Sequence, residues 1–432
     1  MMSCTLFEFD SVVAAGPGAT GYTVPPQVFA WLESQCLSDD AGAPSWLKMS
    51  QRGRLKAIRF TSYVGVVCAP CGYQIEILPK IGQKTSADEA RARLVKMLQC
   101  LAEFRHIRLG DAQLATVRMP LIEVFIKQFL DEVSYVVRRG LRSDYIEHEG
   151  NLPALRGKLV IGRHIPQNLV RPDRFYSRHD EFSQDRPENR LIHAALRIVL
   201  AICKLFENQR LARELSFVFA EVPISTDVKR DINGIRLDRG MSYYASAIEW
   251  AKLILAKLSP IVGAGVQQAQ SLLFPMEVLF EAYVRKHLAR QLQTKFTLDA
   301  QSSSHHLVSH REARWFKLKP DLVVREGRTN HVVLDTKWKL LDATKDNARD
   351  KYQLSQGDFY QLYAYGHHYL DANGNIVLIY PKTDAFSLPL KVFDFPKSAK
   401  MHLWVLPFCI STNKLILPNT GQLDIFFASH LD

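Results

Sequence analysis

The spacing of apolar and polar residues changes at about residue 86. Before that point, apolar residues alternate with polar ones or form short runs separated by glycine and proline, which is typical of strands. Ala57–Val67 and Tyr73–Leu78 are two such runs, and Cys68–Gly72 connects them. The pattern predicts a strand-rich N-terminal domain over residues 1–85.

From Ser86 onward the apolar residues recur at helical spacing. Ser86 and Glu89 form a capping-box pattern before the apolar residues of Ala90–Phe104. The same spacing predicts further helices, at residues 119–139, 188–207 and 240–258. We therefore predict a mainly helical middle region over 86–265, with a boundary in Ser259–Val266, where small residues and proline separate helical patterns.

Residues 138–178 form a basic and less regular stretch inside this middle region. It holds nine Arg or Lys residues against four acids, and Tyr145, Phe175 and Tyr176 lie among them. One interpretation is contact with phosphate groups or with an acidic protein surface. The other is an ordinary solvated face, and the sequence leaves both open.

Two charged motifs lie at the ends of apolar runs in the C-terminal third. Asp321 follows Pro320, and Asp335-Thr336-Lys337 ends a second run. We predict that Leu322–Val324 pairs with Val332–Leu334 across the turn at 326–328, which brings Asp321 beside Asp335. Because residues i and i+2 of a strand share a face, Asp335 and Lys337 should project together, with Thr336 turned into the opposite layer.

Two carboxylates beside an ammonium group suit a hard divalent cation such as Mg²⁺, which prefers oxygen ligands and keeps several waters. Such a metal acidifies a bound water and neutralises charge on a phosphodiester, and the lysine positions the nucleophile. The alternative is a solvated ion pair at a strand edge. Charge at the end of a buried-looking strand favours the metal, because buried charges are usually paired or metal-bound.

Two predicted helices flank these motifs. Leu272–Val284 carries Glu277 and Glu281 four residues apart on one face, either as a third carboxylate for the metal or as an ordinary polar face. In the second helix, at 356–365, Gln361 and Tyr365 share a face. Their amide and phenol groups suit contact with a DNA backbone or a hydrogen bond that orients the lysine.

Bulk properties restrict the class of protein. A net charge of +11 and a pI near 9.2 suit a polyanionic partner such as DNA. Seven scattered cysteines indicate a reducing compartment rather than a disulfide framework. We expect a cytoplasmic protein without a membrane span, because no apolar run reaches about 18 residues and no signal peptide is evident.

Other candidate chemistry is weaker. Cys68 and Cys71 form a lone CxxC without a second ligand pair, so we predict a turn with incidental thiols. We predict that His305, His306 and His310 lie in a polar surface loop rather than in a metal site. The sequence has no Gly-x-x-x-x-Gly-Lys-Ser/Thr loop, so the chain alone should bind no nucleotide.

The order of these motifs resembles a known family. Residues 270–385 resemble a PD-(D/E)XK nuclease domain, and the Gln361–Tyr365 spacing is similar to that of its RecB-like branch. More of the chain resembles the McrC family, the nuclease subunits of McrBC-type modification-dependent (type IV) restriction systems. The resemblance rests on the Asp321 and Asp335-Thr336-Lys337 motifs together with four shorter pieces: Ile75–Ile81, Leu155–Leu159, Asp185–Ile192 and Leu279–Val284.

The resemblance implies a fold and a set of roles. The fold is α/β (α+β over the whole chain), with a restriction-endonuclease-like mixed sheet flanked by helices in a nuclease domain at 266–432. Asp321 and Asp335 would bind Mg²⁺, for which Mn²⁺ would substitute, and Lys337 would be catalytic. Glu281 would be an accessory acid, and Gln361 and Tyr365 would support the site.

The resemblance also implies partners. An McrB-like AAA+ GTPase ring would recognise methylated double-stranded DNA, and this chain would stimulate its GTP hydrolysis and cut the DNA. Residues 1–85 and the basic stretch at 138–178 are candidate ring contacts. Two alternatives stay open: a self-sufficient RecB-like repair nuclease, and a non-catalytic adaptor of an AAA+ ring.

Overall fold

The computed structural model describes residues 3–17, 19–37, 46–81, 85–101, 119–257, 270–302 and 304–427. The chain groups into two compact units. The first combines Met1–Gly65, Ile75–Arg118 and Leu273–Asp432, and the second combines Val66–Gln74 and Met119–Leu272. The predicted boundary at 259–266 lies outside the described residues, and the division into three regions stays a prediction.

The N-terminal part of the first unit is built mainly from strands, as predicted. These are β1 (Ser3–Phe7), β2 (Ser11–Ala14), β3 (Tyr22–Val24), β4 (Leu47–Arg52), β5 (Leu55–Phe60), β6 (Tyr63–Cys68) and β7 (Gln74–Leu78). Two four-stranded sheets have the orders β3-β2-β5-β4 and β1-β7-β6-β11. The region also contains a helix that the sequence did not predict, α1 (Pro26–Leu37), which packs on β2 and β4.

The first predicted helix is confirmed as α2 (Ala87–Leu98). The Ser86 hydroxyl accepts a hydrogen bond from the Glu89 amide at 3.3 Å, as the capping pattern required. The helix ends at Leu98, earlier than the predicted Phe104. Residues 102–104 lie outside the described part of the chain.

The second unit contains a helical bundle. Its helices are α4 (Leu121–Arg139), α6 (Pro187–Ile202), α7 (Phe206–Val218), α8 (Val228–Gly234), the 3-10 helix η2 (Arg239–Tyr244) and α9 (Ala245–Lys257). The prediction of a single helix at 188–207 is wrong, because α6 ends at Ile202 and a separate helix, α7, begins at Phe206. Glu123, which is buried on α4, accepts hydrogen bonds from the backbone amides of Lys204 and Leu205 at this break. Another helix therefore fixes the start of α7.

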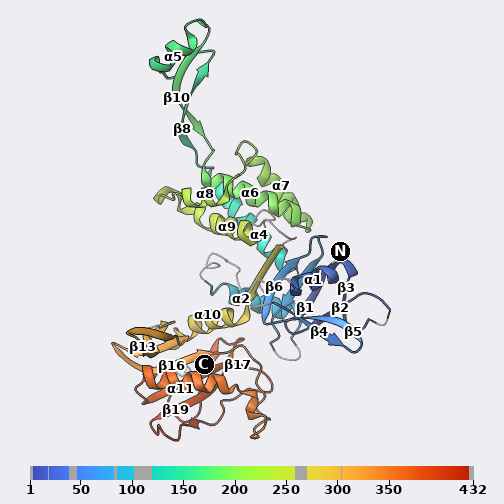
Figure 1. Cartoon of the computed structure of the whole chain (residues 1–432), viewed down its shortest axis with the longest axis vertical. Helices are drawn as coiled ribbons and strands as arrows, with labels where there is room; N and C mark the ends of the chain where they lie inside the picture. Colours follow the sequence, from blue (N-terminus) through green and yellow to red (C-terminus); the bar gives the residue numbers. More distant parts are fainter. Residues whose placement is uncertain are drawn as a thin grey trace. The chain divides into compact units, whose positions relative to one another are not determined.

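The basic stretch at 138–178 forms regular secondary structure, whereas the sequence indicated a less regular segment. The strands β8 (Asp144–Leu152) and β10 (Phe175–Ser183) pair antiparallel over nine residues each. The short strand β9 (Lys158–Leu159) joins β10, and α5 (Ile161–Asn168) lies near their far end. In Figure 1 this long hairpin projects from α6 and α8 within its own unit; we call residues 144–183 the arm.

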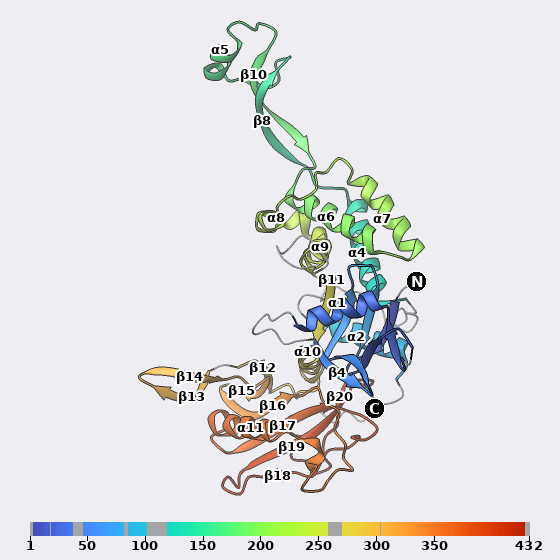
Figure 2. The same cartoon turned by 45° about the vertical axis from the view of Figure 1, so that its right-hand side comes forward.

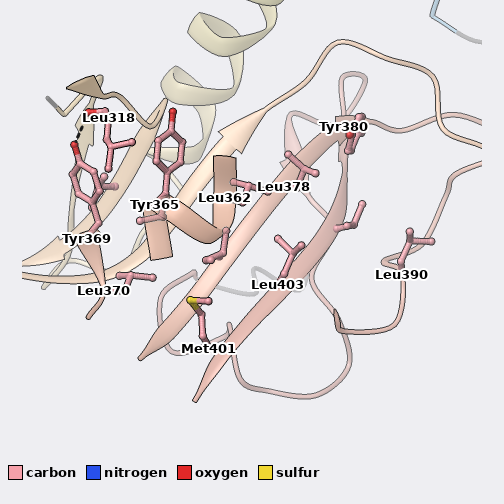
Figure 3. Packing of buried hydrophobic residues seen from close by; sticks show 14 of the residues in the cluster. Leu318, Leu362, Tyr365, Tyr369, Leu370, Leu378, Tyr380, Leu390, Met401 and Leu403 are labelled. Atoms are coloured by element: carbon pink, nitrogen blue, oxygen red, sulfur yellow. Dashed lines mark hydrogen bonds between the residues drawn. The ribbon is translucent and has the colours of Figure 1, made fainter. Parts of the chain in front are cut away.

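The C-terminal part of the first unit contains a seven-stranded mixed sheet. Its strands are β12 (Thr297–Ala300), β15 (Leu322–Glu326), β16 (Thr329–Thr336), β17 (Gly374–Pro381), β18 (Phe393–Asp394), β19 (Met401–Cys409) and β20 (Lys414–Leu415). The strands β16, β17 and β19 are parallel neighbours. The helix α11 (Gln356–Tyr369) connects β16 to β17 and packs on both. Figure 3 shows Leu362 and Tyr365 of this helix against Leu378 and Leu403 of the sheet.

The helix predicted over Leu272–Val284 is partly wrong. Its first residues form the strand β11 (Gln270–Pro275), and α10 (Met276–Leu288) begins only after Pro275. Proline has no amide hydrogen and fixes its own φ, so it commonly precedes or opens a helix. The Met276 amide donates to the Ser62 carbonyl at 2.9 Å, and strand pairing therefore competes with helix formation here. No helix of the described residues is long and apolar enough to span a membrane.

Candidate functional site

The pairing that should unite the two charged motifs is confirmed. Leu322, Val323 and Val324 of β15 lie opposite Leu334, Val333 and Val332 of β16. The turn between these strands contains Gly327 in the left-handed region at φ 59°. All six apolar side chains are buried, which fixes the register because a slip of one residue would expose them.

Asp321 and Asp335 meet at the end of this strand pair. The Asp321 carboxylate accepts hydrogen bonds from the backbone amide and the hydroxyl of Thr336, both at 2.7 Å. Lys337 forms an ion pair with Asp335 through Nζ and Oδ2. Thr336 was expected to turn away from Asp321, but its hydroxyl holds that carboxylate in place. The regular strand ends at Thr336, so strict alternation does not extend through Lys337.

Asp335 is almost completely buried and its carboxyl is strongly perturbed. Burial, followed by repulsion from Asp321, raises the pKa of Asp335 to about 7. The attraction of Lys337 lowers this pKa but does not compensate for the other two effects. A carboxylate that is costly to ionise without a strong cation is typical of functional sites.

Lys337 sits at the same end of the sheet with part of its side chain exposed. Burial acts to lower the pKa of Lys337, but Asp335 and Asp321 outweigh that effect, and the net pKa is raised. Its backbone amide donates to the carbonyl of Ile379 on β17 at 2.9 Å. The ammonium is therefore charged at neutral pH, and the backbone of Lys337 is anchored to the neighbouring parallel strand.

Of the two glutamates on α10, Glu281 lies near the site. Burial and repulsion from Asp321 raise the pKa of Glu281, and its Oε1 accepts a hydrogen bond from Gln301 at 3.1 Å. Glu277 instead accepts a hydrogen bond from the Ser62 hydroxyl at 2.7 Å. The two positions thus separate, and Glu281 is the one that faces the aspartates.

Gln361 and Tyr365 share a face of α11, as predicted, but they act on backbone rather than on Lys337. The Tyr365 hydroxyl donates to the Lys319 carbonyl at 3.0 Å, and the Gln361 amide donates to that hydroxyl at 2.7 Å. Burial and the charge of Asp335 raise the pKa of Tyr365. This pair therefore fixes the segment that carries Asp321.

Two residues near the site were not predicted. Asp358, in the first turn of α11, repels Asp335 and helps to raise its pKa. Tyr380 is fully buried on β17, and burial and the charge of Asp358 raise its pKa far above the usual value. Neither belongs to a sequence motif. The only signal was the position of Asp358 four residues before the buried Leu362 on the helix that covers the sheet.

The next residue, Trp338, links the site to the N-terminal strands of the same unit. Its indole Nε1 donates to both carboxyl oxygens of Glu8, at 2.8 and 3.0 Å. The Lys80 amide donates to the same carboxyl at 2.8 Å. Glu8 is fully buried, and burial raises its pKa to about 8. A side chain adjacent to Lys337 is therefore fixed by residues more than 250 positions away in sequence.

The donor set fits a magnesium ion of the kind that keeps most of its waters. Asp335 Oδ2 is buried and accepts no regular hydrogen bond from the described residues beyond its ion pair with Lys337. Among those residues no group of three or more His, Cys, Asp or Glu side chains forms a complete metal cage. Mg²⁺ commonly uses only one or two carboxylates, so Asp321 and Asp335 would be sufficient protein ligands.

The remaining sequence candidates fall outside this site. Cys68 and Cys71 are free thiols; Cys68 ends β6 and Cys71 lies in the turn between β6 and β7, which confirms the predicted turn. His305, His306 and His310 lie on a strand, β13 (His305–His310), and not in the loop that was predicted. In the hairpin with β14 (Ala313–Leu318), His305 lies on one face and His306 and His310 lie four residues apart on the other.

Comparisons with known proteins place the chain in a family. The chain resembles a chain of a refined half-complex from a tetradecameric assembly of Thermococcus gammatolerans McrB AAA+ hexamers with bound McrC. The two share 21% identity with a TM-score of 0.68, and the match covers 96% of each chain. The chain also resembles a chain of the cryo-EM structure of the Thermococcus gammatolerans McrBC complex, at 21% identity and a TM-score of 0.50, covering 67% of this chain and 87% of that one. A search of curated proteins gave no match.

These structural likenesses show a shared fold, which confirms the mixed α/β prediction. The family assignment rests on sequence. The model of the McrBC 5-methylcytosine restriction system component matches residues 58–381, well over half of the chain. The matched range includes Glu281, Asp321, Asp335 and Lys337. The chain therefore belongs to the family of McrBC 5-methylcytosine restriction system components.

Proposed function

We propose that this chain is the Mg²⁺-dependent DNA endonuclease subunit of a McrBC-like restriction complex. The observation that carries the proposal is the convergence of Asp321, Asp335 and Lys337 at the end of two paired strands, in a chain of this family. A buried carboxylate with a raised pKa beside a charged lysine is costly to maintain. A role in phosphodiester hydrolysis explains why the fold retains such an unfavourable group.

Each residue has a distinct role in the proposed reaction. Asp321 and Asp335 hold the cation through carboxylate oxygens, and Thr336 fixes the orientation of Asp321. A bound Mg²⁺ supplies an acidified water and neutralises charge on the phosphate. Lys337 donates to the attacking water or to a non-bridging phosphate oxygen, where negative charge develops. Glu281 accepts a proton or orients a second water at the edge of the site.

A separate protein supplies the nucleotide-dependent step. The sequence contains no phosphate-binding loop for GTP, and the structurally similar McrC is bound to McrB AAA+ hexamers. We propose that an McrB-like AAA+ GTPase recognises methylated double-stranded DNA, and that this chain binds the ring, stimulates its GTP hydrolysis and cuts the DNA. Cleavage thereby becomes conditional on recognition by the partner.

The arm is the proposed contact with that ring. Its far end exposes five apolar side chains, with Val170 at 85% and Leu169 at 80% exposure; the others are Leu155, Ile161 and Ile165. Exposed apolar groups that gather on one element usually mark a protein contact. Near them Arg156, Arg171 and Arg174 have no carboxylate partner among the described residues. An acidic, partly apolar groove on the partner would match this surface.

The test is reconstitution with an McrB-like AAA+ GTPase. We expect cleavage of a methylated plasmid only when this chain, the partner, GTP and Mg²⁺ are all present. Mn²⁺ should replace Mg²⁺, and an unmethylated plasmid should stay intact. Efficient cutting by the isolated chain would contradict the proposal in favour of a self-sufficient nuclease.

A matched pair of variants tests the site itself. Asp335→Ala removes a metal ligand and should abolish cleavage while leaving the stimulation of GTP hydrolysis intact. Asp346→Ala removes an exposed carboxylate from the loop after β16 and should leave both activities unchanged. If Asp335→Ala still cut the plasmid, the assignment of Asp321, Asp335 and Lys337 would be wrong.

A further inference from the structure

On its other side, β15 pairs with β12, and these two strands lead into a second hairpin beyond the seven-stranded sheet. β12 pairs antiparallel with β15, and β13 pairs antiparallel with β14. Because these strands follow one another in sequence, the two pairs are consecutive halves of one long hairpin, bent at the segment that holds Asp321. Figure 2 shows the outer half, β13 and β14, pointing away from the sheet. We call residues 305–319 the wing.

The inner end of the wing is fixed to the helix that covers the site. The Tyr369 hydroxyl donates to the Leu318 carbonyl at 3.0 Å, and the His305 ring packs edge-on against Tyr369 with centroids 4.5 Å apart. One turn earlier on α11, Tyr365 donates to the Lys319 carbonyl. The wing therefore has a defined direction relative to Asp321, two residues beyond Lys319.

The rest of the wing is exposed on both faces. Every residue from Leu307 to Lys317 is exposed, including Trp315 at 48% and Phe316 at 68%. Val308 lies opposite Trp315, and Ser309 lies opposite Arg314, so neighbouring pairs point to opposite faces. A two-stranded hairpin with no buried face contributes little stability by itself. Large apolar groups at such a place indicate a surface that a ligand covers.

The charge of the wing identifies the ligand. It carries four cations, Arg311, Arg314, Lys317 and Lys319, against one acid, Glu312. In the described part of the chain none of these four cations forms an ion pair with a carboxylate. Unpaired cations interleaved with aromatic groups match the phosphates and sugars of a nucleic acid. The adjoining site contains two aspartates, so nearby positive charge is needed to attract a polyanion.

We propose that the wing is a DNA-binding ribbon that grips the duplex beside the scissile phosphodiester. A strand of six residues spans about 20 Å, close to the length of six base pairs. A two-stranded ribbon also fits the major groove. The cations would contact backbone phosphates, and Trp315 and Phe316 would contact sugars or base edges. The inference rests on the proposed DNA cleavage and deepens it.

Binding is measured on the isolated full chain, without divalent cations, by fluorescence anisotropy of a labelled 30-base-pair duplex. The test variant is Arg311→Ala/Arg314→Ala/Lys317→Ala. The control is Lys391→Ala/Lys397→Ala/Lys400→Ala, which removes three exposed cations from the segments next to β18, at the edge of the sheet opposite β12. Both variants change the net charge equally, so non-specific attraction falls equally in both.

We expect the wing variant to bind the duplex at least about tenfold more weakly at low salt. The slope of the logarithm of the binding constant against the logarithm of the salt concentration should become shallower by about one for each lost phosphate contact. The control should bind within about twofold of the unmodified chain. Trp315→Ala should weaken binding without changing the slope, because it removes contacts that carry no charge. Unchanged thermal unfolding of each variant shows that the fold is retained, and the single change Arg314→Glu provides a second, smaller perturbation.

Equal binding by the wing variant and the control would overturn the proposal. So would normal DNA binding combined with lost association with the GTPase, which would make the wing a protein contact. The nuclease assignment fails separately: if the wing variant loses DNA binding but the unmodified chain never cuts DNA with its partner, the wing stands and the proposed cleavage falls.

Discussion

The seven-stranded sheet of the first unit and the arm both carry charged groups at one end, but different forces hold them together. The sheet buries continuous apolar strands such as Val332–Leu334, and its charged site residues lie at the ends of these runs. The arm has few buried residues and is held by strand pairing and cross-strand ion pairs, such as that of Arg178 with Glu149 at 3.0 Å. A core can position catalytic groups to fractions of an ångström. An exposed hairpin suits a contact that forms only when a partner arrives.

This contrast predicts that chemistry and partner contact can be lost independently. The largest effect should come from Lys337→Ala, which removes the only cation in contact with Asp335 in the described part of the chain. We expect the cleavage rate of the complex to fall about a thousandfold, as for other groups that stabilise charge in a transition state. Stimulation of GTP hydrolysis should stay normal. A loss of both activities would show that the sheet and the arm do not act separately.

The reciprocal change targets the arm. Leu169→Ser/Val170→Ser removes two apolar side chains that are at least 80% exposed. If they anchor the GTPase ring, its affinity should fall by about 30-fold to 1,000-fold, the range for hot-spot residues. The unfolding free energy should change by less than about 0.5 kcal/mol, because the side chains are exposed. Titration calorimetry with the ring measures the affinity.

The control for the arm is Phe217→Ser, which removes an exposed apolar side chain from α7 in the same unit. It should leave the affinity for the ring within about twofold, because only the apolar groups of the interface centre carry much binding energy. Equal losses in both variants would indicate a general effect of surface polarity. The arm would then have no special role in binding.

The same contrast explains what could be predicted from sequence. The β15–β16 pairing followed from apolar runs, a turn and charged ends, because burial on both faces leaves a clear pattern. The arm gave no such pattern, since ion pairs like Arg178–Glu149 involve residues that also occur in loops. The break between α6 and α7 depends on Glu123 from another helix. Asp358 was missed for a related reason: its proximity to Asp335 arises only from packing of α11 on the sheet.

The buried Glu8 carboxyl connects the N-terminal strands to Trp338, the residue after Lys337. Its ionisation should reveal how much this connection stabilises the fold. Its pKa is raised from 4.5 to about 8, so the folded chain binds this proton more tightly than the unfolded chain does. Stability from this group is therefore lost as pH rises from about 4.5 to 8, by a few kcal/mol in total. Glu8→Gln keeps an acceptor for Trp338 and Lys80 but cannot ionise.

Urea unfolding at pH 6 and pH 9 measures this difference. The unmodified chain should lose stability relative to Glu8→Gln as pH increases, and the variant should be the more stable protein at pH 9. Parallel pH profiles for the two proteins would contradict the assignment of a buried, protonated Glu8. Glu33→Gln, which changes a half-buried glutamate paired with the exposed Lys56, provides the control and should leave the profile unchanged.

The smallest effect distinguishes two tyrosines on α11 that donate to neighbouring carbonyls. Tyr365 holds Lys319, next to the Pro320-Asp321 pair, whereas Tyr369 holds Leu318 at the base of the wing. Each change to Phe removes all hydrogen bonds of one hydroxyl, including its donation to a carbonyl, and should cost about 1 to 2 kcal/mol of stability. Only Tyr365→Phe should also slow cleavage, by about threefold to tenfold, because only it loosens the segment that carries a metal ligand. Raising the Mg²⁺ concentration should recover part of that loss. Equal cleavage rates in the two variants would mean that the Gln361–Tyr365 pair supports the fold and not the position of Asp321.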